Sequence, residues 1–245
     1  MLQSVRELHQ YRVQAEDGDV GEVTAFTFDD ESWTIRYLVV DAGRWLFGRR
    51  VLIPTRHLGD PKWEEEVFPS HLTKKQIEQS PDVDLNKPVS RRMEGELHEY
   101  YHLTPYWRPR VEAGTVAQIG AEGEEAESTV PSKRSALRST REVFGYDVQA
   151  EDGDVGSVAD FLVDDKSWNI RYLVVDTAQW LSRDKVLIAP DWVTEVDWAL
   201  REVQVGLTRE EVENAPSFDQ SEPIERSYEV RLYDYYGRPK YWEQA

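Results

Sequence analysis

Short runs of apolar residues, some alternating with polar ones, are separated by turn residues in the first part of the chain. The runs cover residues 13–15, 20–28, 34–41, 51–53 and 62–68. Asp17-Gly18, between the first two runs, is a strong hairpin signal, and Asp29-Asp30 begins the next turn. The pattern predicts short antiparallel strands that build a small barrel or sandwich.

Two helices are predicted after these strands. Thr73 is a suitable N-cap for a short helix within residues 72–79, which stops before Pro81. A second helix is expected over residues 91–101 and ends near Pro105.

The second half of the chain repeats the first. A shift of 135 positions aligns Tyr11 with Tyr146 and Ile53 with Ile188 without a gap, and 28 of those 43 positions are identical. The same register continues to the end of the chain, where Trp107 aligns with Trp242. A period of this kind marks a duplicated structural unit, so we predict two copies of one small fold of about 100 residues each. The helices recur at residues 207–214 and 226–236.

Residues 108–140 separate the two copies and contain few large apolar side chains among many charged and small ones. Such a composition cannot bury enough surface to order itself, so we interpret this segment as a flexible acidic linker. The predicted domains are a first unit at 1–107 and a second unit at 141–245, each a barrel followed by helices and an aromatic tail. The linker allows the units to pair within one chain or between chains.

The third strand of each unit is apolar on both faces. Ile35, Tyr37 and Val39 share the face that we expect to fill the barrel, and the opposite face forms an outer apolar row. The outer row consists of Leu38, Val40, Leu173 and Val175. An apolar row on a barrel exterior is covered by something, so we expect the unit's own helices, the sister unit or a partner protein to lie over it.

Each unit ends in a tail of four large aromatic residues. They are Tyr100, Tyr101, Tyr106 and Trp107 in the first unit and Tyr235, Tyr236, Tyr241 and Trp242 in the second. Such residues supply much of the energy of interfaces, and they can also fold back over their own barrel. We predict that they form an interface together with the outer apolar rows.

The sequence His98-Glu-Tyr-Tyr-His102 matches H-E-x-x-H, a pattern that can place two imidazoles on one helix face for zinc, with Glu99 as general base. A zinc-dependent hydrolase that uses these three residues is therefore an alternative function. Tyr233 and Gly237 replace the histidines in the second copy. We favour the interpretation in which the chain has no metal site and no catalytic residue.

The turn sequences Asp17-Gly-Asp19 and Asp29-Asp30 recur in the second copy. They are typical of hairpin turns and also offer oxygen ligands for a cation. Their spacing falls short of the known calcium loop, so we favour turn chemistry, and the sequence alone leaves cation binding open.

Composition and charge exclude several functional classes. The 29 Lys and Arg against 47 Asp and Glu give a net charge of −18, which repels nucleic acid and anionic lipid. The absence of cysteine excludes disulfides and thiolate chemistry. The sequence contains no apolar run long enough for a membrane helix or a signal peptide, so we expect a cytoplasmic protein without membrane insertion. It also contains no phosphate loop or nucleophile elbow, and we expect no cofactor and no enzymatic activity.

The motifs Gly153-Asp-Val-Gly-Ser-Val, Ile170-Arg-Tyr-Leu-Val-Val-Asp176 and Lys185-Val-Leu-Ile-Ala-Pro190 resemble the PRC-barrel. This family is named after the cytoplasmic domain of the photosynthetic reaction-centre H subunit. The resemblance covers residues 8–81 and 143–216. It implies a small SH3-like antiparallel β-barrel that has no chemistry of its own and serves as a docking module.

We therefore expect a mainly β, non-enzymatic tandem PRC-barrel scaffold. It would pair with itself through the outer rows and aromatic tails, within one chain or between chains, and present an acidic surface to an unidentified protein partner. The resemblance also implies a further alternative, an accessory protein of a photosynthetic or other electron-transfer complex.

Overall fold

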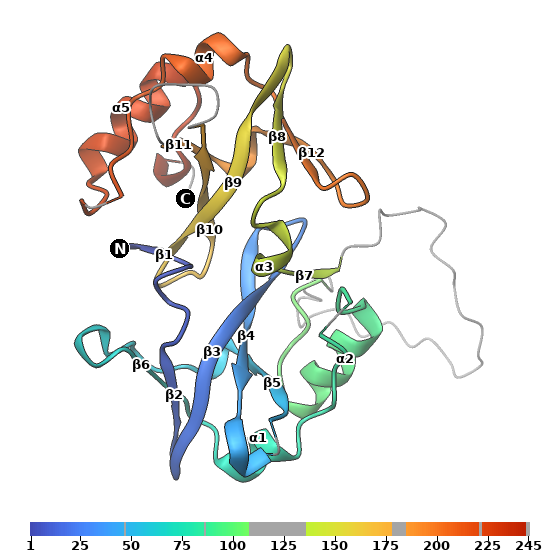
Figure 1. The fold of residues 1–245 in the computed structure, drawn as a ribbon. Helices are drawn as coiled ribbons and strands as arrows, with labels where there is room; N and C mark the ends of the chain where they lie inside the picture. Colours follow the sequence, from blue (N-terminus) through green and yellow to red (C-terminus); the bar gives the residue numbers. More distant parts are fainter. Residues whose placement is uncertain (47, 86, 108–135, 178–184, 221, 244–245) are drawn as a thin grey trace, which may run out of the picture.

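The computed structural model of the protein consists of two β-sheets with short helices around them (Figure 1). The structure describes residues 1–46, 48–85, 87–107, 136–177, 185–220 and 222–243. Each sheet corresponds to one copy of the repeat. The predicted fold class, mainly β with two small barrels that are each followed by helices, is confirmed.

The first sheet has the strand order β5-β4-β3-β2-β6. Its strands are β2 (Arg12–Ala15), β3 (Gly18–Asp29), β4 (Thr34–Asp41), β5 (Arg50–Pro54) and β6 (Val67–Pro69). The pairs are antiparallel except β2 with β6, which is parallel. Of the predicted run 62–68, only the end lies in β6, because residues 63–65 form a 3-10 turn.

The second sheet repeats this arrangement in the order β11-β10-β9-β8-β13-β12. Its strands are β8 (Asp147–Ala150), β9 (Gly153–Asp164), β10 (Ile170–Asp176), β11 (Lys185–Ile188), β12 (Val193–Asp197) and β13 (Glu202–Val205). The β12–β13 hairpin is a continuous ladder, whereas its counterpart in the first unit is paired by two isolated bridges, Leu58 with Ser70 and Lys62 with Val67.

The predicted helices are present in both units. They are α1 (Lys74–Glu78), α2 (Arg91–Tyr100), α4 (Arg209–Glu213) and α5 (Arg226–Tyr236), and a single turn, α3 (Thr140–Val143), precedes the second barrel. Thr73 and Thr208 begin α1 and α4 with complete capping boxes, as the sequence predicted for Thr73. No helix in the described part of the chain is long and apolar enough to cross a membrane.

The units exchange their first strands. The N-terminal strand β1 (Leu2–Ser4) pairs with β9 of the second unit, and β7 (Leu137–Ser139), which precedes the second unit, pairs with β3 of the first (Figure 1). Both pairs are antiparallel, and the repeat makes them equivalent, since Leu2 aligns with Leu137 and Asp29 with Asp164. Each sheet therefore contains one strand that the other unit supplies.

This exchange changes the predicted domain boundaries. Residues 108–135 of the predicted linker lie outside the described residues. Residues 137–139 were also assigned to the linker, but they form β7 and are hydrogen-bonded to the first unit.

The predicted orientation of the third strand is wrong in both units. Tyr37 of β4 lies against His98 of α2, with 6.5 Å between the ring centres. Its equivalent, Tyr172 of β10, donates a hydrogen bond of 2.9 Å to Glu229 of α5. The row that was expected to fill the barrel therefore faces the helices. The predicted outer row, Leu38, Val40, Leu173 and Val175, lies on the opposite face of the strands and has no exposed surface.

Candidate functional site

Two turns meet where the barrels join. The β3–β4 turn carries Trp33 and the β9–β10 turn carries Trp168, both with left-handed backbones (φ 50° and 58°). The amide of Ile35 donates to the Trp168 carbonyl, and the amide of Ile170 donates to the Trp33 carbonyl, each at 2.8 Å. This reciprocal pair places the approximate two-fold axis of the duplication between the turns.

A ladder of aromatic rings crosses the same interface. The rings run in the order Phe26, His9, Phe144 and Phe161, with centre-to-centre distances of 5.9, 6.1 and 5.7 Å. His9 and Phe144 occupy equivalent positions of the repeat. Burial, reinforced by the positive charges of Arg141 and Arg6, lowers the pKa of His9 to about 4. The imidazole is therefore neutral at physiological pH and serves as a packing ring.

A buried carboxylate links the N-terminal strand to the second barrel. Asp160 of β9, 1% exposed, accepts hydrogen bonds from the Ser4 hydroxyl and from the Arg6 amide, the latter at 3.0 Å. Burial raises the pKa of Asp160, whereas its hydrogen bonds to Ser4, Phe161 and Arg6 oppose that effect. The equivalent residue of the first unit is Ala25, so this polar contact exists on one side of the interface only.

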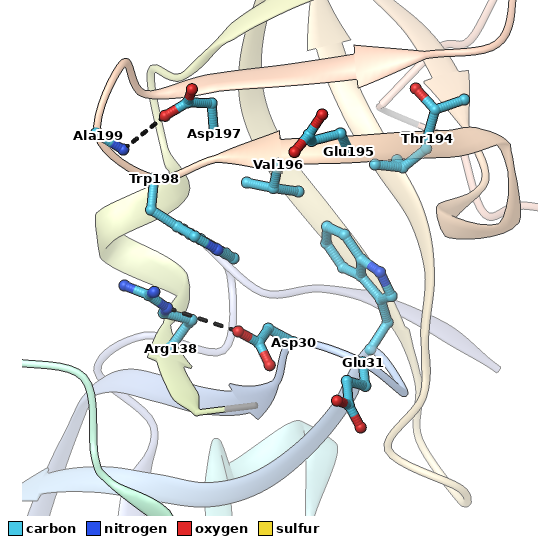
Figure 2. A pocket seen from close by; sticks show the side chains of 11 residues that line it. Asp30, Glu31, Arg138, Thr194, Glu195, Val196, Asp197, Trp198 and Ala199 are labelled. Atoms are coloured by element: carbon cyan, nitrogen blue, oxygen red, sulfur yellow. Dashed lines mark hydrogen bonds and ion pairs between the residues drawn. The ribbon is translucent and has the colours of Figure 1, made fainter. Parts of the chain in front are cut away.

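The interface leaves a groove on one side of the axis, which we name the Trp33 groove (Figure 2). It encloses about 600 Å³ between the β3–β4 turn, β7 and the β12–β13 hairpin. Its lining residues are Asp30, Glu31, Trp33, Arg138, Val193, Thr194, Glu195, Val196, Asp197, Trp198 and Ala199. Both units contribute to it, so the groove exists only because the barrels are joined.

Arg138 of β7 fixes one end of the Trp33 groove. Its guanidinium lies over the Trp198 ring, 4.0 Å from the ring centre, and 3.8 Å from the Asp30 carboxylate. Asp30 also accepts a hydrogen bond of 3.1 Å from the amide of Ala136. Asp197 accepts two amide hydrogen bonds in the hairpin turn, from Ala199 and Leu200. Asp30 and Asp197 thus accept structural hydrogen bonds, and the exposed residues Glu31 and Glu195 also line the groove.

The duplication produces a second groove on the opposite side of the axis, the Trp168 groove, which encloses about 740 Å³. It is lined by residues 34–36, 55–56, 58–61, 71 and 165–168. Its charges differ from those of the Trp33 groove. Lys166 stands where the Trp33 groove has Glu31, and Arg36 and Arg56 also line it.

The aromatic tails contact their own units. Tyr100 and Tyr235 donate to the carbonyls of Gln76 and Glu211 at 2.6 and 2.8 Å, and Tyr101 donates to the carbonyl of Leu52 at 2.9 Å. The remaining contacts are Tyr106 with Asp29, Trp107 with His98, Tyr236 with Trp192, Tyr241 with Glu229 and Trp242 with Tyr233. Within the chain these residues form lids over their own barrels, and the contacts described above between the units come from other residues. A contact of the tails with another molecule stays a prediction.

Buried polar groups hold each lid. In the second unit, Glu229 of α5 accepts from Tyr172 and Tyr241 at 2.9 and 2.8 Å and pairs with Arg226 at 2.9 Å. Burial, together with the charge of Glu229, raises the pKa of Tyr172 far above its usual range. These bonds connect strand, helix and tail into one unit.

The first lid uses a different carboxylate. Tyr106 and Arg91 both donate to Asp29, at 3.0 and 3.1 Å. Burial raises the pKa of Asp29, but hydrogen bonds from Ser32, Arg91 and Tyr106 outweigh this and lower it to about 2.

The structure contradicts the geometry on which the zinc alternative depends. Helix α2 ends at Tyr100, so His102 lies beyond it with a left-handed backbone (φ 55°) and an exposed side chain. His98 is buried between the rings of Tyr106 and Trp107. The two imidazoles therefore do not share a helix face. Among the described residues, no group of three or more His, Asp or Glu side chains could hold a metal ion.

The aspartates of the turns make hydrogen bonds that stabilise those turns. The carboxylate of Asp17 accepts from the amide of Lys74, and that of Asp152 accepts from the amide of Arg209, both at 2.7 Å. Asp29 and Asp164 each accept from the serine three residues later. These contacts agree with the interpretation of the motifs as turn chemistry.

Sequence reasoning missed the residues that join the barrels: Trp33, Trp168, His9, Phe144 and the strands β1 and β7. One available signal was a large aromatic residue at the same turn position in both copies, since turns favour small or polar residues. The exchanged strands are three residues long and carry no distinctive pattern of their own.

Comparison with known families agrees with the geometry. The family model described as the PRC-barrel domain matches the chain twice, at residues 3–67 and 137–206. Both matches begin within an exchanged strand, and together they cover more than half of the chain. A comparison with curated proteins gave no match. The PRC-barrel is generally a non-catalytic domain. With two matched copies and two barrels of the expected kind, this chain belongs to the PRC-barrel domain family.

Proposed function

We propose that the protein is a non-catalytic scaffold in which two PRC-barrels act as one unit that binds a partner protein. The observation that carries this proposal is the reciprocal exchange of β1 and β7. Exchange fixes the relative position of the barrels and creates grooves whose walls come from both units. A rigid pair of binding surfaces is what a scaffold requires.

The pairing of barrels is proposed to be complete within one chain. Among the described residues, the exposed large hydrophobic side chains are Met1, Leu200 and Tyr235, which is too few for an extensive apolar interface. The net charge of −18 also makes chains repel one another. We therefore propose a monomer whose association partner is another protein.

Affinity capture from a native extract tests the proposal, with the full chain and the variant His9→Ala/Phe144→Ala as baits. This variant removes the centre of the ring ladder and substitutes none of the residues that line the two grooves. We expect the native chain to retain specific proteins in constant proportion and the loosened variant to lose them. Equal retention by both baits, or retention by neither, would contradict the scaffold proposal.

A further inference from the structure

We propose that the Trp33 groove binds a basic segment of the partner protein, in which arginine or lysine lies next to an apolar residue. This inference rests on the proposed scaffold function and adds the chemistry of the partner. It is carried by the charge of the groove, by its aromatic walls and by the contrast with the Trp168 groove.

The charge of the groove favours a cation. Glu31 comes from the turn of the first unit and Glu195 from β12 of the second, and both side chains are exposed along the groove (Figure 2). The lining has four carboxylates against one cation, Arg138, which already contacts Asp30 and Trp198. A positive side chain in the groove meets carboxylates from both units, Glu31 from the first and Glu195 from the second.

The walls of the groove are suited to a guanidinium and to an apolar neighbour. Arg138 over Trp198 demonstrates that this site already stacks a guanidinium on an indole. Trp33 is partly exposed, packs against Phe28 and lines the groove. At the tip of the adjacent hairpin, Leu200 is 65% exposed, which offers an apolar contact beside the charged one.

The Trp168 groove has the same origin in the duplication but the opposite preference. Lys166 replaces Glu31, and Arg36 and Arg56 add two further cations against Asp60 and Asp165. A basic segment meets less opposite charge there than in the Trp33 groove. We therefore expect one bound segment per chain, in the Trp33 groove.

A labelled peptide in which arginine alternates with leucine tests the inference, by fluorescence anisotropy with the full chain at physiological ionic strength. The groove variant is Glu31→Lys/Glu195→Lys. The control, Glu99→Lys/Glu213→Lys, makes the same change of charge at exposed positions on α2 and α4. We expect the groove variant to weaken binding about tenfold or more and the control to weaken it less than about threefold. Thermal unfolding checks that both variants remain folded.

Equal weakening by both variants would mean that the general negative field binds the peptide, and it would overturn the groove assignment. Undetectable binding to the native chain would overturn it as well. Neither result affects the capture experiment with the ladder variant. The failure of the groove and the failure of the scaffold function are therefore separate outcomes.

Discussion

At the scale of single residues, the duplication supplies a comparison for nearly every side chain. Position 9 of the repeat is histidine in the first copy and phenylalanine in the second, and both rings stack in the same ladder. Because either ring fits at this position, the position requires a ring of suitable shape and packing. The partly buried, neutral His9 differs from Phe144 in one respect, because acid can charge it.

His9→Phe is expected to reduce the loss of stability in acid. The pKa of His9 is about 4 in the folded protein and 6.5 ordinarily, so the unfolded chain binds the proton more readily. His9 therefore lowers the free energy of unfolding as the pH falls from about 6.5 to about 4, by about 1–2 kcal/mol after allowance for its partial exposure. Urea unfolding of both proteins at several pH values measures this difference.

The raised pKa of Asp160 acts in the opposite direction, but it is common to both proteins and cancels in the comparison. Parallel stability curves for the native chain and His9→Phe between pH 7 and pH 4 would contradict the assignment.

Gly156→Ala is expected to destabilise the protein by about 3 kcal/mol or more. A Cβ atom at Gly156 would lie 2.0 Å from the carbonyl oxygen of Asp176. The φ angle of Gly156 is also positive, at 132°, a conformation that residues other than glycine rarely adopt. Gly95→Ala is the matched control, because a Cβ there meets nothing within 4 Å and α2 gains a better helix former. Urea unfolding should give a gain of about 0.5–1 kcal/mol for Gly95→Ala. Similar effects of the two substitutions would refute this account.

At the scale of elements, each barrel is closed by a helix and a tail that hold buried polar groups. The hydrogen bonds of these buried groups differ between the two units. In the second unit, Tyr172 and Tyr241 share the carboxylate of Glu229. In the first unit, the Tyr106 hydroxyl donates a hydrogen bond to Asp29 instead, and the Tyr37 hydroxyl has no hydrogen-bond partner among the described residues. Equivalent tyrosines in β4 and β10 therefore have different energetic roles.

Tyr172→Phe should cost about 1–2 kcal/mol, because it removes a donor to a buried carboxylate. Tyr37→Phe should leave the free energy of unfolding unchanged or raise it, since it removes a buried hydroxyl that has no partner among the described residues. Chemical denaturation of the two variants beside the native protein measures both values. Equal costs would show that the lids are equivalent after all.

At the scale of the whole molecule, strand exchange joins two small domains more firmly than contact between finished surfaces. Each barrel lacks one strand unless the other unit is present. Because β1 and β7 are equivalent in the repeat, either can in principle complete either barrel. The fold therefore has the properties of a dimer whose two halves are connected by the chain.

Two fragments, 1–120 and 121–245, are expected to associate when they are produced together. The cut lies outside the described residues, and each fragment retains one donated strand and one receiving edge. Light scattering after size exclusion should give one species near the 28.5 kDa of the intact chain. Fragment 121–245 alone should form a homodimer, because β7 can pair with β9 of a second copy. Separate monomeric fragments would contradict the role of the exchange.

The sequence by itself determined the duplication, most of the strands, the longer helices of each unit, and the family. Those features are local or are repeated in register, so the pattern of residues 20–28 or the cap at Thr73 is sufficient to predict them. The sequence also determined that Leu38 and Val40 share one face of a strand. It could not determine which face is the interior, because an alternating pattern shows which residues share a face of the strand but not which face points inward.

Only the tertiary structure decided how the units meet. The exchange depends on three-residue strands that pair across more than 100 positions, and so short a segment has no pattern that identifies its partner. The grooves follow from the exchange, because Glu31 of the first unit and Glu195 of the second line one groove only when the barrels are joined. The sequence does not decide which unit each tail covers. The tails fold onto their own barrels because the buried carboxylates that accept hydrogen bonds from their hydroxyls lie there.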